Sequence, residues 1–207
     1  MKVKLMKRPV SKPIYLANGK IEIMEQETIW QRFVHLFKVK VRVPKFAGGH
    51  MDVIREIHHH GNAAVILPVD PKRRTVLLVR QWRIPPLFNN HDEPLLEVVA
   101  GIIDEGEKPA ECAMRETLEE TGYQVLNPVE IAQCYSSPGT LTEYYYLFTG
   151  EYDRDKRVHE GGGHDHEGED IEVVEVSFDE LDAMLAQGEI KDAKTLLAAN
   201  WILGRHA

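Results

Sequence analysis

Two uninterrupted apolar runs constrain the fold of this chain more than any other feature. Residues 63–67 (AAVIL) and 76–79 (VLLV) contain no polar side chain, and residues 70–74 (DPKRR) between them have the composition of a turn. Continuous apolar runs of this length are typical of strands that are buried on both faces of a sheet. We therefore expect an α/β (α+β) fold in which helices cover both faces of a mixed sheet, an α/β/α sandwich.

Further strands and helices are predicted around these two runs. Four more segments have strand patterns: 95–100, 129–135, 142–152 and 171–176. Ser177 and Glu180 match a capping box, which predicts a helix that ends near residue 187, before Gly188. A last helix is predicted over about 192–203, and residues 153–169 (DRDKRVHEGGGHDHEGE) form a long polar loop.

The N-terminal residues 1–58 are predicted to form a separate small antiparallel sheet. Three segments in this part have strand patterns: 20–27, 33–43 and 50–58. Three strands build only a small core, so we expect this sheet to lean on the rest of the chain or on a second subunit. The predicted domains are therefore an N-terminal sheet, 1–58, and a larger domain, 59–207.

The segment 101–123, GIIDEGEKPAECAMRETLEETGY, is predicted to be a loop that leads into a helix. Acidic residues precede Pro109, and both acidic groups and proline suit the first turn of a helix. Gly122 follows Thr121 as the expected left-handed residue after the helix. The predicted helix therefore runs from about Pro109 to Thr121.

Three glutamates crowd one side of that predicted helix. Glu116, Glu119 and Glu120 are three and four residues apart, and like charges at this spacing cost a few tenths of a kcal/mol per pair. A hard divalent cation would relieve the repulsion, because Mg²⁺ prefers carboxylate oxygens at about 2.1 Å. The alternative for an isolated pattern of this kind is a solvated acidic helix face.

The spacing of the fixed residues resembles the signature of the Nudix family. The matching positions are Gly101, Glu107, Arg115, Glu116, Glu119, Glu120 and Gly122. One position departs, because Thr117 stands where the family favours a bulky apolar residue, which is a packing position. The resemblance implies an α/β/α sandwich and a hydrolase of nucleoside diphosphates that are linked to another group.

Features outside the signature resemble the ADP-ribose pyrophosphatase branch of this family. Pro138 lies about fifteen residues past the signature, and the matching segments are 27–28, 55–57, 81–83, 137–139 and 169–171. This resemblance implies hydrolysis of ADP-ribose to AMP and ribose 5-phosphate. GDP-mannose pyrophosphatases share most of these features, including the run Gly161 to Gly163, so GDP-mannose remains an alternative. A sensor that binds a nucleotide sugar without cleaving it is an alternative of another class, although sensors commonly lose the signature glutamates.

The resemblance also implies a set of metal ligands. Glu116 and Glu120 are the principal ligands, Glu119 is a third ligand or holds a water, and the backbone carbonyl of Ala100 completes the set. The expected cofactor is Mg²⁺, with Mn²⁺ as a substitute. Arg115 is expected to orient Glu119 instead of touching substrate.

The general base is expected on the long polar loop. By resemblance it is Glu167, two residues before the Glu-Asp-Ile segment, and Glu169 remains open as an alternative. The alternative for Glu167 is a solubilising charge on a flexible linker. The histidine-rich segments 58–60 and 164–166 are interpreted as solvated, since neighbouring residues of a strand alternate between faces and do not converge on one metal.

Four residues are candidates for substrate binding. Arg83 and Arg55 could each bind phosphate or ribose oxygens, with a surface salt bridge as the alternative. Phe33 could stack on the base or belong to a core. Glu97 could line the site beside Ala100 or face solvent from its strand.

The composition and the N-terminal residues limit the classes of partner and the location that we expect. The chain has 207 residues, and its 33 Asp and Glu outnumber 25 Lys and Arg, which gives a formal charge of −8 and makes nucleic acid an unexpected partner. The N-terminus lacks the apolar core of a signal peptide, and no run approaches the ~20 apolar residues of a membrane helix, so a cytoplasmic protein is expected. The resemblance implies a homodimer that exchanges its N-terminal sheets, with partner residues in the pocket for a small nucleotide sugar.

Overall fold

The computed structural model describes residues 21–164 and 168–204. It divides into two compact units. The first comprises the chain up to Gly61 together with Ser137–Glu143, and the second comprises Asn62–Ser136 and the chain from Tyr144 onwards. The division at Gly61 lies three residues beyond the boundary that the sequence suggested, and the segment 137–143 groups with the first unit.

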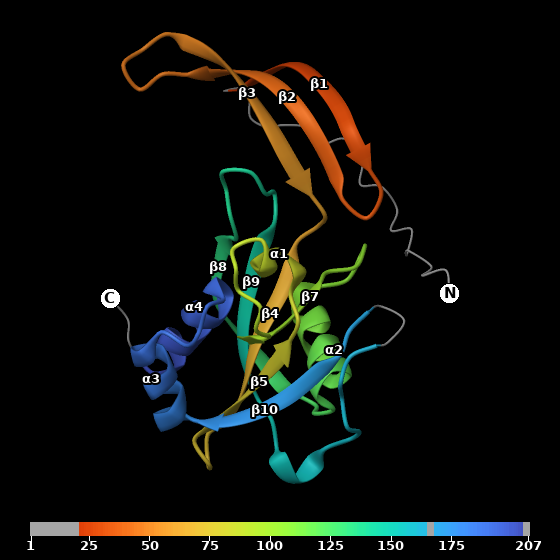
Figure 1. Cartoon of the computed structure of the whole chain (residues 1–207), viewed down its shortest axis with the longest axis vertical. Helices are drawn as coiled ribbons and strands as arrows, with labels where there is room; N and C mark the ends of the chain where they lie inside the picture. The colour runs from red at the N-terminus through yellow and green to blue at the C-terminus, as the bar shows by residue number, and fades with distance from the viewer. Residues whose placement is uncertain (1–20, 165–167, 205–207) are drawn as a thin grey trace. The chain divides into compact units, whose positions relative to one another are not determined.

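The first unit contains a three-stranded antiparallel sheet in the order β1-β2-β3 (Figure 1). Its strands are β1 (Glu22–Gln31), β2 (His35–Pro44) and β3 (His50–His59). The register between β2 and β3 is regular along the whole length of both strands, whereas the pairing of β1 with β2 shifts at two places. Only Phe37 and Val39 of its described hydrophobic residues are fully buried, so the core of this sheet is small.

The second unit is built around a mixed sheet of seven strands. These are β4 (Ala63–Asp70), β5 (Thr75–Gln81), β6 (Leu95–Glu97), β7 (Val99–Ile102), β8 (Leu126–Tyr135), β9 (Tyr144–Glu151) and β10 (Ile171–Ser177). The main order is β10-β5-β4-β9-β8, with β6 beside β5 and β7 beside β4. The β4–β9 pair is parallel and the other pairs are antiparallel, which confirms the predicted mixed sheet.

Helices cover both faces of this sheet, as the apolar runs predicted (Figure 1). The helices are α1 (Ile84–Leu87), α2 (Pro109–Thr121), α3 (Phe178–Gln187) and α4 (Ala193–Ile202), with a short 3₁₀ turn at Arg154–Lys156. Every residue of β4 is buried, and alternate residues face opposite sides. Ala64 and Ile66 pack in the core under α2, whereas Val65 and Leu67 pack in the core under α3 and α4.

The strand predicted at 95–100 is two strands that change partner. β6 pairs with β5, and after Val98 the chain continues as β7 and pairs with β4. No glycine or proline marks this change in the sequence. It places Glu97 in one strand pair and Ala100 in the next.

The described part of the chain contains no helix that is long and apolar enough to cross a membrane.

Candidate active site

Helix α2 carries the three glutamates and has the predicted boundaries. It begins at Pro109, where the missing N–H would have had no partner in the helix, and it is followed by Gly122 with φ of 76°. Thr117 is fully buried, and its hydroxyl donates to the carbonyl of Ala113 at 2.7 Å, so a polar residue is tolerated at this packing position.

Gly101 on β7 lies directly against the carboxylate of Glu116. A β-carbon at position 101 would lie 1.9 Å from Oε1 of Glu116 and 2.0 Å from its Cδ. Glycine is required here because the carboxylate occupies the space of a side chain. Ala100 packs in the core under α3 and α4, and the next residue, Gly101, is the one that meets α2.

Arg115 holds the loop before α2 and two of the helix carboxylates. Its Nε and Nη2 donate to Glu107 at 2.9 and 3.0 Å, and its Nη1 donates to Glu116 at 2.7 Å and to Glu119 at 3.0 Å. Glu107 also accepts a bond from the backbone N–H of Asp104, and these bonds hold the pKa of Glu107 below its usual range. Arg115 is therefore hydrogen-bonded to three carboxylates, an arrangement compatible with the expected role of orienting Glu119.

Cys112 lies beside this network and is completely buried. Burial and the nearby carboxylates raise the pKa of Cys112 to about 12, so its thiol stays protonated at neutral pH. It is a packing residue of α2 and not a nucleophile.

Glu120 is the carboxylate that this network leaves without compensation. Its side chain is 3% exposed, and its Oε2 is buried with no hydrogen-bond partner among the described residues. Burial, together with the charges of Glu116 and Glu169, raises the pKa of Glu120 well above its usual value. Burial also raises the pKa of Glu116, although the charge of Arg115 opposes that shift.

Glu169 joins the glutamates of α2 from the long loop. Its charge acts on both Glu116 and Glu120, and it accepts a bond from the backbone N–H of His164 at 3.2 Å. The expected base, Glu167, lies outside the described residues. The alternative that the sequence left open, Glu169, is a described loop residue whose charge acts on the carboxylates of α2.

Three glycines fasten the same loop to the end of α2. The N–H of Gly162 donates to the carbonyl of Glu120 at 2.8 Å, and the N–H of Gly163 to the carbonyl of Glu119 at 3.4 Å. A β-carbon on Gly161 would lie 2.5 Å from the carbonyl oxygen of Glu120. These bonds satisfy carbonyls that a helix end otherwise leaves unpaired. The first half of the predicted loop is thus anchored, and its glycines are needed for close packing.

The donor set fits a hard divalent cation. Glu116, Glu120 and Glu169 combine a deeply buried carboxylate oxygen that lacks a partner with two neighbouring carboxylates, and a cation would compensate all three. In the described part of the chain no three such side chains are already arranged as a closed metal site. Glu116 and Glu119 are instead both hydrogen-bonded to Nη1 of Arg115.

Arg83 and Glu97, two expected substrate ligands, are bound to each other. Nε and Nη2 of Arg83 donate to the two oxygens of Glu97 at 2.8 and 3.1 Å, and Nζ of Lys194 donates to Glu97 at 2.5 Å. Burial alone would raise the pKa of Glu97, but Arg83 and Lys194 outweigh it and hold that pKa below its usual range. Glu97 is therefore an ionised structural partner, whereas Arg83 keeps a side chain that is 41% exposed.

The two other expected ligands belong to the first unit. Phe33 lies in the bend between β1 and β2 and is 46% exposed, so it is not a core residue. Arg55 lies on β3, and its Nη1 donates to the carbonyl of Ile54 at 2.8 Å.

The histidines at 58–60 are half-buried, so the expectation that they are solvated is wrong. The backbone of His58 pairs with the segment 137–143, His59 Nδ1 bonds Thr142 at 2.6 Å, and His60 Nε2 bonds Glu143 at 3.1 Å. They fasten the end of β3 to this segment. Within the ranges 21–164 and 168–204 they form no metal group with other ligands.

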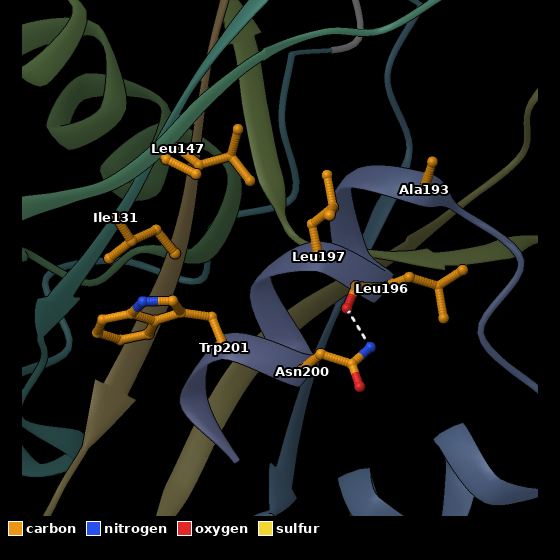
Figure 2. A pocket seen from close by; sticks show the side chains of 8 residues that line it. Ile131, Leu147, Ala193, Leu196, Leu197, Asn200 and Trp201 are labelled. Carbon is orange, nitrogen blue, oxygen red and sulfur yellow. Dashed lines mark hydrogen bonds between the residues drawn. The ribbon is translucent and has the colours of Figure 1, made fainter. Parts of the chain in front are cut away.

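An apolar groove lies between α4 and the strands β8 and β9 (Figure 2). Its volume is about 630 Å³, and Ile131, Leu147, Leu197 and Trp201 line it. Asn200 also lines the groove, and its side-chain amide donates to the backbone carbonyl of Leu196. None of the described residues that line the groove is charged, so we place the chemistry at the carboxylates and not here.

Lys194 and the anchoring role of the three glycines are missing from the sequence interpretation. A lysine in the first turn of a helix is usually solvated, and nothing local distinguishes this buried one. A glycine run usually indicates a flexible loop, and only the tertiary contact with α2 shows otherwise.

Comparison with known proteins assigns the chain to a family. The NUDIX domain model matches residues 58–198. The chain is 40% identical over 178 residues to a GDP-mannose pyrophosphatase of Pectobacterium atrosepticum, covering 86% of this chain and 91% of that protein. It is 41% identical over 179 residues to one of Yersinia enterocolitica, covering 86% and 92%. A solved structure described as an ADP compounds hydrolase has the same fold, with a TM-score of 0.68, 18% identity, and coverage of 92% of this chain and 98% of that one. The chain therefore belongs to the Nudix family and is a Nudix hydrolase.

Proposed function

We propose that this protein hydrolyses the diphosphate linkage of a nucleoside diphosphate sugar with the help of Mg²⁺. The observation that carries the proposal is the buried Oε2 of Glu120, which has no hydrogen-bond partner among the described residues, in a carboxylate on which the charges of Glu116 and Glu169 act. Packing alone does not select such an arrangement, because a buried unpaired carboxylate is costly. A site that must bind a cation explains it.

Glu116, Glu120 and Glu169 are the side chains that would hold the cation. The backbone carbonyl of Ala100 and the carboxylate of Glu119 remain proposed ligands from the family resemblance. A bound divalent cation would neutralise charge on the phosphoryl oxygens and lower the pKa of a water, and Mn²⁺ has the same preference for oxygen ligands.

The residues of the chain then divide the remaining tasks. Arg83, half-exposed and paired with Glu97, would bind a phosphoryl group through its open edge. Arg115 keeps Glu119 and the loop residue Glu107 in place. Arg55 and Phe33 of the N-terminal sheet are proposed contacts for ribose or phosphate oxygens and for the base.

A loop carboxylate would deprotonate the attacking water. We assign this role to Glu167, because Glu169 is already part of the carboxylate cluster. The water oxygen bonds to phosphorus, the bridging P–O bond breaks, and the displaced phosphate leaves with the bridging oxygen. The products are a nucleoside monophosphate and a sugar phosphate.

GDP-mannose is the leading substrate candidate and ADP-ribose the second. Two relatives at 40% and 41% identity, which this chain matches over more than nine-tenths of their length, are GDP-mannose pyrophosphatases. The likeness to the ADP compounds hydrolase concerns the fold alone, at 18% identity. This order reverses the one expected from the sequence patterns.

We further propose a homodimer that uses the N-terminal sheet. That sheet leaves large apolar side chains exposed, among them Trp30 at 54% and Ile54 at 53%, while it buries only Phe37 and Val39 fully among its described hydrophobic residues. Covering such a surface with a second copy would stabilise it.

The test is release of phosphate monoesters from GDP-mannose and from ADP-ribose, each with Mg²⁺ and with EDTA. Metal-dependent formation of GMP or AMP, absent in Glu120→Gln, is the expected result. Tight binding of either compound without turnover would favour the sensor alternative. The absence of both binding and turnover would refute the proposed substrate class.

A further inference from the structure

Glu97 is shared by two cations that come from distant parts of the chain. Its side chain is almost completely buried, and its oxygens accept three bonds, two from Arg83 and one from Lys194. Arg83 follows β5, whereas Lys194 is in the first turn of α4, on the sheet face opposite α2 (Figure 1). One buried carboxylate thus connects the last helix to Arg83.

Lys194 is itself held firmly. It is 7% exposed, and its Nζ donates to Asp192 at 3.0 Å. Asp192 caps α4, because its Oδ2 accepts from the N–H of Thr195 at 2.9 Å. Thr195 in turn accepts a bond from the N–H of Val98, next to Glu97, at 2.8 Å. The ammonium group therefore has a fixed position relative to Glu97.

The guanidinium of Arg83 is divided between an inner and an outer edge. Nε and Nη2 point to Glu97, so Nη1 is the nitrogen that this carboxylate does not engage. Glu120 lies within electrostatic range of the same guanidinium. Nη1 of Arg83 is thus the nitrogen that would donate to a phosphoryl group held by a cation at the carboxylates.

We propose that Lys194 is a positioning residue for phosphate recognition: by sharing the Glu97 carboxylate with Arg83, it sets where the Arg83 guanidinium points. The inference rests on the proposed function, since it requires a ligand with a diphosphate group. The buried negative charge of Glu97 needs nearby positive charge, and Arg83 supplies only part of it because Lys194 supplies the rest. Without the charge of Lys194, Glu97 draws Arg83 inward and the phosphoryl group loses a donor.

The test compares Lys194→Met with Thr195→Val. Both variants remove a buried anchor of α4, but only the first removes a charge that acts on Arg83 through Glu97. Lys194→Met is expected to raise KM for the nucleotide sugar and Kd for inorganic pyrophosphate by about 10-fold or more, as for other residues that orient a ligand group. Thr195→Val is expected to lower Tm and leave KM and Kd within about two-fold.

Two further variants separate a positioning role from general packing. Lys194→Arg keeps the charge and should recover most of the lost affinity. Lys194→Met added to Glu97→Gln should change Kd little beyond Glu97→Gln alone, because no carboxylate remains to be shared. Both measurements use calorimetric titration with pyrophosphate and Mg²⁺, alongside the thermal melt.

The pyrophosphate titration tests the positioning role of Lys194 whether or not sugar nucleotides are substrates. If the unmodified protein hydrolyses none of them, the proposed function fails, and the pyrophosphate titration still tests Lys194. Equal losses of affinity in Lys194→Met and Thr195→Val would overturn the positioning role. So would additive effects of Lys194→Met and Glu97→Gln, or an unmodified protein that does not bind pyrophosphate.

Discussion

Gly101 and Glu116 compete for the same space, since a β-carbon at position 101 would lie 1.9 Å from Oε1 of the glutamate. The backbone of Gly101 does not need the left-handed conformation that favours glycine. The absence of a side chain at this position therefore serves the position of one carboxylate and not the fold of the strand.

We predict that Gly101→Ala lowers activity and leaves the stability of the fold nearly unchanged. The atoms in the way belong to the flexible Glu116 side chain, which can swing aside at little cost to folding. Its displaced carboxylate should raise the Mg²⁺ concentration needed for half-maximal rate and lower kcat/KM by roughly 10–100-fold. A magnesium titration of the rate, with a thermal melt as control, checks this, and a normal magnesium requirement would contradict it.

We predict that Glu120→Gln stabilises the metal-free protein while abolishing turnover. The pKa of Glu120 is raised in the folded state above the usual 4.5, so the folded state binds the proton more tightly than the unfolded state. Stability in EDTA should therefore fall as pH rises from about 4.5 through the folded pKa, and the variant should lose this dependence.

The measurement is Tm in EDTA between pH 5 and pH 8 for both proteins. The Tm of Glu120→Gln should exceed that of the unmodified protein by more at pH 8 than at pH 5. Added Mg²⁺ should stabilise only the unmodified protein. An identical pH dependence of the two proteins would show that Glu120 is not the uncompensated group.

We predict that Gly161→Ala is far more destabilising than Gly188→Ala. Both glycines have nearly the same backbone conformation, with φ of +70° and +69°, so both variants incur the cost of a left-handed residue, about 1–2 kcal/mol. Only at Gly161 would the new methyl group meet backbone atoms of Glu120 and Thr121, at 2.5 and 2.6 Å. Urea unfolding should show the difference, and equal losses would mean that the loop is not fastened to α2.

We predict different phenotypes for Glu167→Gln and Glu169→Gln. Glu169→Gln removes one carboxylate of the cluster and should raise the Mg²⁺ concentration needed for half-maximal rate. Glu167→Gln removes the proposed base, so kcat should fall by about 10²–10⁴-fold with the magnesium requirement unchanged. Full turnover by Glu167→Gln would return the role of base to Glu169.

Acidification should loosen the connection between β3 and the segment 137–143. Burial lowers the pKa of His58 and of His59 in the folded state, and the charges of neighbouring histidines lower both pKa values further. The stability that these neutral rings contribute is fully present above the usual histidine pKa of 6.5 and is lost as pH falls through the folded pKa values. Hydrogen-exchange protection of the Thr142 amide, which donates to His58, should fall between pH 7.5 and pH 5.5 relative to amides of α3. Unchanged relative protection would refute this.

The parts of the fold that could be predicted are those set by local rules. Pro109 and Gly122 define the ends of α2 because their backbones suit those two positions and few others. The apolar runs at β4 and β5 predicted helices on both faces, because no polar residue is available for a solvated side. The carboxylates of α2 followed from the helix and its spacing alone.

The network around Glu97 could not be predicted, since its members are 14 and 97 residues apart from it. A glutamate in a strand next to the signature is compatible with a ligand and with a solvated face, and only the positions of Arg83 and Lys194 decide between them. The change of partner after Val98 is equally hidden, because no turn residue marks it.

The change of partner between β6 and β7 also has a consequence for how this sequence can vary. Glu97, which binds Arg83, and Gly101, which makes room for Glu116, are four residues apart along a stretch that pairs first with one strand and then with another. An insertion or deletion of one residue between them would move the side chains on one side of that point to the opposite face of the sheet. Residues 95–102 should therefore accept no change of length across evolution, whereas the loop beyond Gly163 should accept many.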